Sequence, residues 1–133
     1  MRVLIPFLIG AAMVWVIGIQ ACHKHEKVDE SLVNIEITSP SEGQSFKVND
    51  NILIRANITS TGILHGWAVQ IRQKGDNQIL FNQSVHDHKR SFNIDLSWKP
   101  NLTQSAELIL EVFAQVEHDG KKVSKTITFQ VHS

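Results

Sequence analysis

Cysteine is almost absent from this 133-residue sequence, and its scarcity limits both the fold and the chemistry. Cys22 is the only one, so no intrachain disulfide can form. Glycine is also scarce, with seven residues, and no glycine-rich phosphate-binding loop is found. The sequence contains neither a Gly-x-Ser-x-Gly elbow nor a His-Glu-x-x-His helix. From these absences we expect a protein that is not an enzyme.

An excess of one charge is lacking as well, because 13 Lys and Arg balance 13 Asp and Glu. A nucleic-acid-binding domain usually carries a basic patch and a high isoelectric point. The balanced composition gives no such electrostatic footprint, so we expect no nucleic-acid partner. The chain length fits one domain.

The one long apolar run lies at the start of the chain. Arg2 is followed by an almost wholly apolar stretch up to Ile19, and from His23 onward the sequence is abruptly charged. A basic residue followed by an apolar run is typical of an export signal. A run of about 17 residues is also the lower limit for an uncleaved membrane-spanning helix. Either interpretation predicts a membrane-tethered protein outside the cytoplasm.

The end of this run, Ile19-Gln20-Ala21-Cys22, resembles the lipobox of bacterial lipoproteins. The resemblance implies that residues 1–21 are a cleaved signal peptide. It also implies that Cys22 becomes the new N-terminus and carries a thioether-linked diacylglycerol, with palmitate as a typical acyl chain. The expected location is the cell envelope of a bacterium, with the outer membrane favoured over the inner one.

Residues 22–31 are polar and without periodicity, and we expect them to form a flexible tether. In the domain that follows, residues 32–133, apolar and polar side chains alternate with period two, the pattern of half-buried β-strands. No helical pattern competes with it. The sequence therefore predicts an all-β fold, an immunoglobulin-like antiparallel β-sandwich of about seven strands. The expected strands are centred on residues 33–37, 52–58, 67–71, 79–85, 92–98, 108–116 and 123–131.

Two segments add a resemblance to this pattern. The stretch from Pro40 to Phe46, followed by Asn49 to Ile54, resembles the first two strands of bacterial Ig-like modules. The final hairpin, residues 108–131, is similar to their last two strands. As a whole, residues 33–131 resemble small single-domain bacterial lipoproteins of a family whose function is not known. The resemblance implies a fold and a location, but no chemistry.

Histidine, in contrast, is plentiful, with seven residues. His86 and His88 lie at positions i and i+2 of one expected strand, on the same face and about 7 Å apart. Successive strands of an antiparallel sandwich reverse direction, so alternate loops fall at opposite ends. By this count His65 and His118 fall at the same end as His86 and His88. The first strand also starts at this end, so we expect the tether with His23 and His25 to lie nearby.

Four histidines at one end are candidate ligands for a zinc or copper ion, since neutral imidazoles bind these metals at roughly 2 Å. Asp87 and Asp119 are candidate carboxylates that would hydrogen-bond the rings and fix their tautomers. The alternative is that these are ordinary strand-end and turn residues. His118, for example, directly precedes the hairpin-type pair Asp119-Gly120.

Three functions therefore stay open. The first is a lipid-anchored, non-enzymatic Ig-like module that holds a protein or glycan partner through its loops or a sheet edge. The second is binding or sensing of zinc or copper through the histidine end. The third is a structural accessory subunit of an envelope complex.

Overall fold

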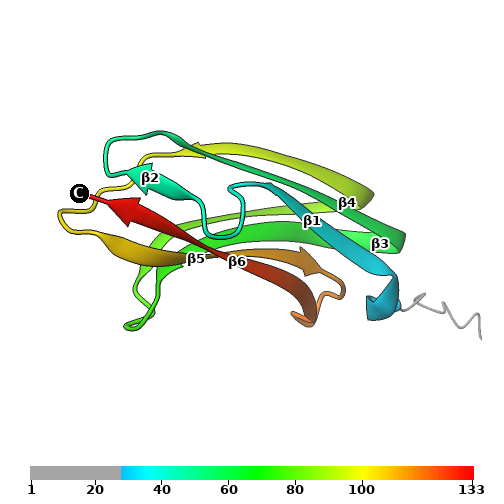
Figure 1. Ribbon diagram of the computed structural model, residues 1–133. Coiled ribbons are helices and arrows are strands. Elements are labelled where there is room, and N and C mark those ends of the chain that lie inside the picture. Colours follow the sequence, from blue (N-terminus) through cyan, green and yellow to red (C-terminus); the bar gives the residue numbers. More distant parts are fainter. Residues whose placement is uncertain (1–27) are drawn as a thin grey trace, which may run out of the picture.

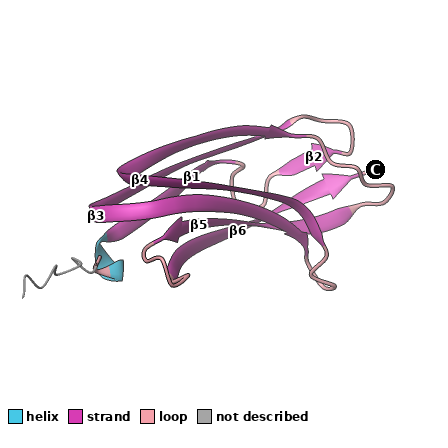
Figure 2. Ribbon diagram, turned by 180° about the vertical axis from the view of Figure 1, so that it is seen from behind, coloured by secondary structure: helices cyan, strands magenta, loops and turns pink. Residues whose placement is uncertain are grey.

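The computed structural model describes residues 28–133, and almost all of its regular structure is β (Figure 2). The predicted signal peptide, Cys22, His23 and His25 lie outside the described residues. No helix in residues 28–133 is long and apolar enough to cross a membrane. A short 3-10 helix, η1 (Glu30–Leu32), precedes six strands: β1 (Val33–Ser39), β2 (Ser45–Lys47), β3 (Ile52–Gln73), β4 (Ile79–Trp98), β5 (Ala106–Gln115) and β6 (Lys122–His132).

The long strand β3 is the centre of the fold. It pairs with β4 along most of its length, with β1 along its first half and with β5 along its second half, always antiparallel. Beyond β5 follow β6, antiparallel, and the short β2, which is parallel to β6. Both β3 and β4 turn back at the end of the molecule where η1 lies, so that their halves belong to two layers (Figure 1). This is the predicted all-β, immunoglobulin-like sandwich.

The seven predicted strands occupy five continuous ones, because β3 and β4 each contain two of them, and the short β2 is a sixth strand that was not predicted. Residues 52–58 and 67–71 were predicted as two separate strands, yet β3 runs through the segment between them. Thr59 pairs with Ser91 and Leu64 pairs with Lys89, so residues 60–63 of β3 lie opposite Arg90 alone. The extra residues lengthen the outer path at the corner, as in a β-bulge, and the two strands bend together without leaving the sheet.

The core between the layers is wholly apolar. No polar or charged residue is buried in the described part of the chain. Full burial of a large apolar side chain contributes roughly 1.5–3 kcal/mol. The alternating pattern therefore fixes which face of each strand turns inward. The largest fully buried side chains are those of Ile52, Ile54, Ile58, Leu64, Val69, Ile71, Leu108, Leu110, Val112, Val116, Phe129 and Val131.

The first described residues pack against the domain. Val28 is buried, and it lies so close to Gly62 that a Cβ at Gly62 would come within 2.7 Å of it. The Glu30 carboxylate forms an ion pair with Lys121 Nζ at 2.6 Å. Residues 28–31, expected to be the end of the tether, therefore attach to the corner of β3 and to the turn between β5 and β6.

Candidate metal centre

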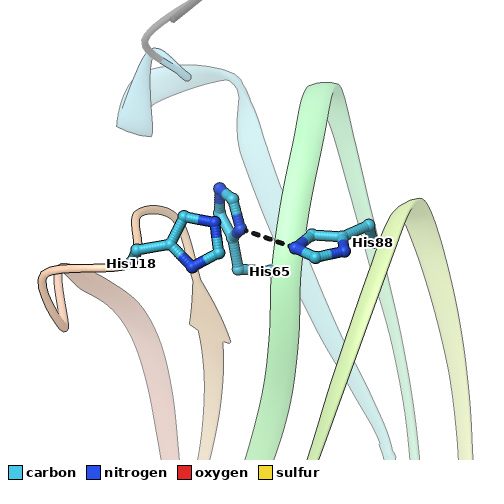
Figure 3. Close-up of side chains that lie close together, drawn as sticks. All are labelled: His65, His88 and His118. Carbon is cyan, nitrogen blue, oxygen red and sulfur yellow. Dashed lines mark hydrogen bonds between the residues drawn. The ribbon is translucent and has the colours of Figure 1, made fainter.

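Three segments bring histidines to the end of the sandwich where β3 and β4 turn back. His65 follows the corner of β3, His86 and His88 precede the corner of β4, and His118 lies in the turn between β5 and β6. Figure 3 shows the ring of His65 between those of His88 and His118. The proximity of the four histidines that strand order predicted is thus present in the structure.

The register of β3 and β4 sets the positions of three of these rings. Leu64 pairs with Lys89 and Gly66 pairs with His86, so a single residue of β3, His65, lies opposite Asp87 and His88. This two-against-one arrangement is a β-bulge, which bends the strand and turns its side chains. It brings the rings of His65 and His88 face to edge, with centroids 4.9 Å apart.

Gly66 permits the two strands to approach each other at this bulge. Its φ is +145°, a backbone conformation that residues with a Cβ rarely adopt. A Cβ at this position would lie 2.2 Å from the carbonyl oxygen of Val85 and 3.1 Å from Cα of His86. Only glycine therefore allows the backbone of β4 to run this close to His65.

A tight hairpin turn places His118. The backbone N–H of Val116 donates to the carbonyl of Lys121 at 2.8 Å, and that of Gly120 donates to Glu117 at 3.3 Å. Gly120 adopts the left-handed region with φ +93°. The turn projects His118 over β3, and its ring centroid lies 3.9 Å from that of His65.

The ring nitrogens converge on one point. His65 Nδ1 and His88 Nε2 are 3.0 Å apart and share a hydrogen bond whose donor depends on the tautomers. His65, His88 and His118 each offer one nitrogen, and these three atoms lie within 4.8 Å of one another. Ligand nitrogens of a tetrahedral zinc ion are about 3.3 Å apart, given Zn–N distances near 2.0–2.1 Å. Small side-chain rotations would suffice to reach that spacing.

The electrostatics of the site favour a neutral ring at His65. Half-burial lowers the pKa of His65 from its ordinary value near 6.5, and the neighbouring His118, His88 and His86 lower it further. The carboxylate of Glu117 acts in the opposite direction. A neutral imidazole has a free lone pair for a metal ion, so at neutral pH the central ring of the cluster is in a ligand-competent form.

The two aspartates expected to orient the rings have other partners. Asp87 accepts the backbone N–H of His88 at 2.8 Å and pairs with Lys89 Nζ at 2.7 Å. The hydrogen bond from Lys89 is the main cause of its lowered pKa. Asp119 accepts the backbone N–H of Lys121 at 3.1 Å. In the described residues neither carboxylate bonds a histidine ring, because Asp87 alternates to the other face of β4 and Asp119 stabilises the turn.

Glu117 is the acidic residue that the sequence did not single out. It stands beside the cluster, half-buried, where its carboxylate raises the pKa of His65. Its carboxylate is 3.9 Å from Lys121 Nζ. The available signal was its position directly before His118, which the alternation pattern concealed.

No protein-family model and no curated protein matches the chain. Among solved structures, the fibronectin(III)-like modules of CbhA from Clostridium thermocellum are 16% identical, with a TM-score of 0.48, over 74% of this chain and 96% of that one. A CARDB domain from Pyrococcus furiosus, solved in complex with di-metal ions, is 13% identical, with a TM-score of 0.44, over 76% of this chain and 94% of that one. Both likenesses concern the fold alone.

Proposed function

We propose that this protein is a lipid-anchored, non-enzymatic envelope protein whose Ig-like domain binds one zinc or copper ion through His65, His88 and His118. The observation that carries the proposal is the convergence of three ring nitrogens, from three separate segments, within 4.8 Å. Imidazole nitrogens favour zinc, copper and nickel, whereas calcium and magnesium prefer oxygen ligands. The two aspartates that the sequence offered, Asp87 and Asp119, are engaged elsewhere, which also favours a nitrogen-ligated ion.

The anchor would hold this end of the domain near the membrane. Cys22 precedes Val28 by six positions, which an extended chain spans in at most about 20 Å. Val28 packs at Gly62, three positions before His65. A lipid on Cys22 would therefore keep Val28, and with it the end of the domain that carries the histidine cluster, near the bilayer surface, where the cluster would bind ions in the periplasm or at the cell surface.

The test is a calorimetric titration of the full-length protein in detergent with zinc and copper. His23 and His25 are replaced by asparagine, which gives a background chain without histidines before the described domain. We expect one ion per background chain and loss of binding in His88→Ala. His132, an exposed histidine on β6 outside the cluster, provides the matched control, because His132→Ala should bind like the background chain. Unchanged binding in His88→Ala would refute the proposal.

A second candidate is binding of a protein partner at the edge of β4. Among the described residues β4 pairs only with β3, which leaves the other edge of its first half open. Ile79 and Val85 on this half are exposed, at 57% and 37%. An added strand from a partner would use such an edge. The test is chemical cross-linking at this edge. A partner bound there would be cross-linked to His88→Ala but not to Ile79→Asp.

A further inference from the structure

His86 carries the fourth ring of the cluster. Three ligands alone do not define whether a bound ion keeps an open coordination position. We infer that His86 completes an all-imidazole, four-coordinate site, so that the bound ion has no position open to water or substrate. This inference rests on the proposed metal-binding function. It decides whether the protein holds the ion in a closed site or presents a reactive one, because catalytic zinc sites keep an open position and closed sites do not.

The spacing of the four rings fits one ion. With a nitrogen about 2.0–2.1 Å from the metal, each imidazole centre lies about 3.2 Å from it, and tetrahedral ligands then have ring centres about 5.2 Å apart. The six distances between the centroids of His65, His86, His88 and His118 range from 3.9 to 6.5 Å. They bracket the expected value, so the four rings lie close to the separations that one ion requires.

His86 has the freedom to complete the set. Its centroid is 4.9 Å from that of His88 and 5.9 Å from that of His118, with the largest gap, 6.5 Å, to His65. The residue is exposed, and no hydrogen bond fixes its ring within the described part of the chain. A rotation about its side-chain bonds therefore costs no buried contact. The backbone position is secured independently by pairing with Gly66.

Glu117 is the competing candidate for the fourth position. Its carboxylate lies 3.9 Å from Lys121 Nζ, and Lys121 in turn pairs with Glu30 at 2.6 Å. To bind the ion, Glu117 would have to give up this interaction, whereas His86 gives up none. An oxygen ligand would also add a negative charge, and a fourth imidazole leaves the ligand set neutral. The geometry therefore favours His86, with Glu117 beside the ligands.

The experiment uses cobalt(II) as a spectroscopic probe in the background chain described above. Four-coordinate cobalt has intense visible bands, and an open coordination position is revealed when added azide changes them. We expect one cobalt ion per chain, a spectrum insensitive to azide, and four imidazoles in X-ray absorption of the zinc-loaded protein. In His86→Ala we expect affinity to fall by more than about tenfold and the cobalt spectrum to become azide-sensitive. Glu117→Gln should behave like the background chain.

The outcomes separate this inference from the function on which it rests. If the background chain binds one ion but responds to azide, or if X-ray absorption counts three imidazoles, His86 is not a ligand and the three-histidine site stands. If Glu117→Gln rather than His86→Ala opens the site, the fourth ligand is the carboxylate and the inference is overturned. If no ion binds, or if His88→Ala binds as the background chain does, both proposals fail.

Discussion

Nδ1 of His65 and Nε2 of His88 lie 3.0 Å apart although 23 positions separate the two residues in the sequence. They meet because β3 and β4 turn the same corner and a bulge places His65 opposite His88. His118 reaches the same point from the turn between β5 and β6. An ion held by these rings would link three segments that are brought together only by folding, and would therefore stabilise the folded state.

The first prediction concerns this linkage. Zinc at about 100 times its dissociation constant should stabilise the protein by about 2.7 kcal/mol. For a domain of this size such a gain corresponds to a rise in Tm of roughly 10 °C or more. Thermal unfolding followed by circular dichroism, with and without zinc, should show this rise in the wild type and in His132→Ala. His88→Ala should show little or none. Equal shifts in all three proteins would place the ion elsewhere.

The second prediction concerns Gly66. Replacement by alanine would place a Cβ 2.2 Å from the carbonyl oxygen of Val85 and impose a strained backbone. We expect a loss of stability of roughly 1–3 kcal/mol and a weaker metal site, since β4 must move away from His65. Gly75 is the control, because its φ is +106° but no atom lies within 4 Å of its Cβ position.

For the glycine variants, urea denaturation measures stability and calorimetry measures metal affinity. Gly75→Ala should lose only about 1–2 kcal/mol of stability, the usual cost of a left-handed residue with a side chain, and should keep its affinity for zinc. A Gly66→Ala protein with full zinc affinity would show that the close approach of the strands is not needed for the site.

The third prediction concerns acid stability. Thr128 donates its backbone N–H to Glu42 at 3.0 Å, and its hydroxyl also donates to this carboxylate. These hydrogen bonds lower the pKa of Glu42 below its ordinary value of 4.5. Because the unfolded state then takes up its proton at higher pH, Glu42 contributes stability above pH 4.5, and this contribution is lost as the pH falls through the lowered folded value. The Glu42→Gln variant should therefore lose less stability than the wild type between pH 6 and pH 3. Parallel slopes in urea denaturation would contradict this.

The fourth prediction concerns the anchor. If Cys22 carries the lipid, cells fed a labelled palmitate should incorporate it into the wild type and not into Cys22→Ser. The variant should also keep its signal peptide, because cleavage at a lipobox follows lipid addition to the cysteine. The readouts are label in the purified protein and its mass. A cleaved and released Cys22→Ser protein would instead indicate an ordinary export signal.

Much of the fold follows from the sequence alone. The period-two alternation of runs such as Ile52 to Ile58 and Leu108 to Val116 determined which residues are strands and which side chains are buried, because burying an apolar face is the dominant gain in such a chain. The reversal of successive strands also placed His65, His86, His88 and His118 at one end. These are local patterns and a topological rule, and they require no knowledge of long-range contacts.

The tertiary structure alone decided how these parts meet. The corner that joins two predicted strands into β3 depends on pairing of Thr59 with Ser91 and Leu64 with Lys89, a register set by residues about 30 positions apart. The same register turns Asp87 away from the rings, while the β5–β6 turn brings Glu117 beside them. The three ring nitrogens lie within 4.8 Å of one another, and a shift of a few ångströms in any one segment would separate them. A sequence pattern fixes the face of a strand, whereas packing between strands fixes such distances.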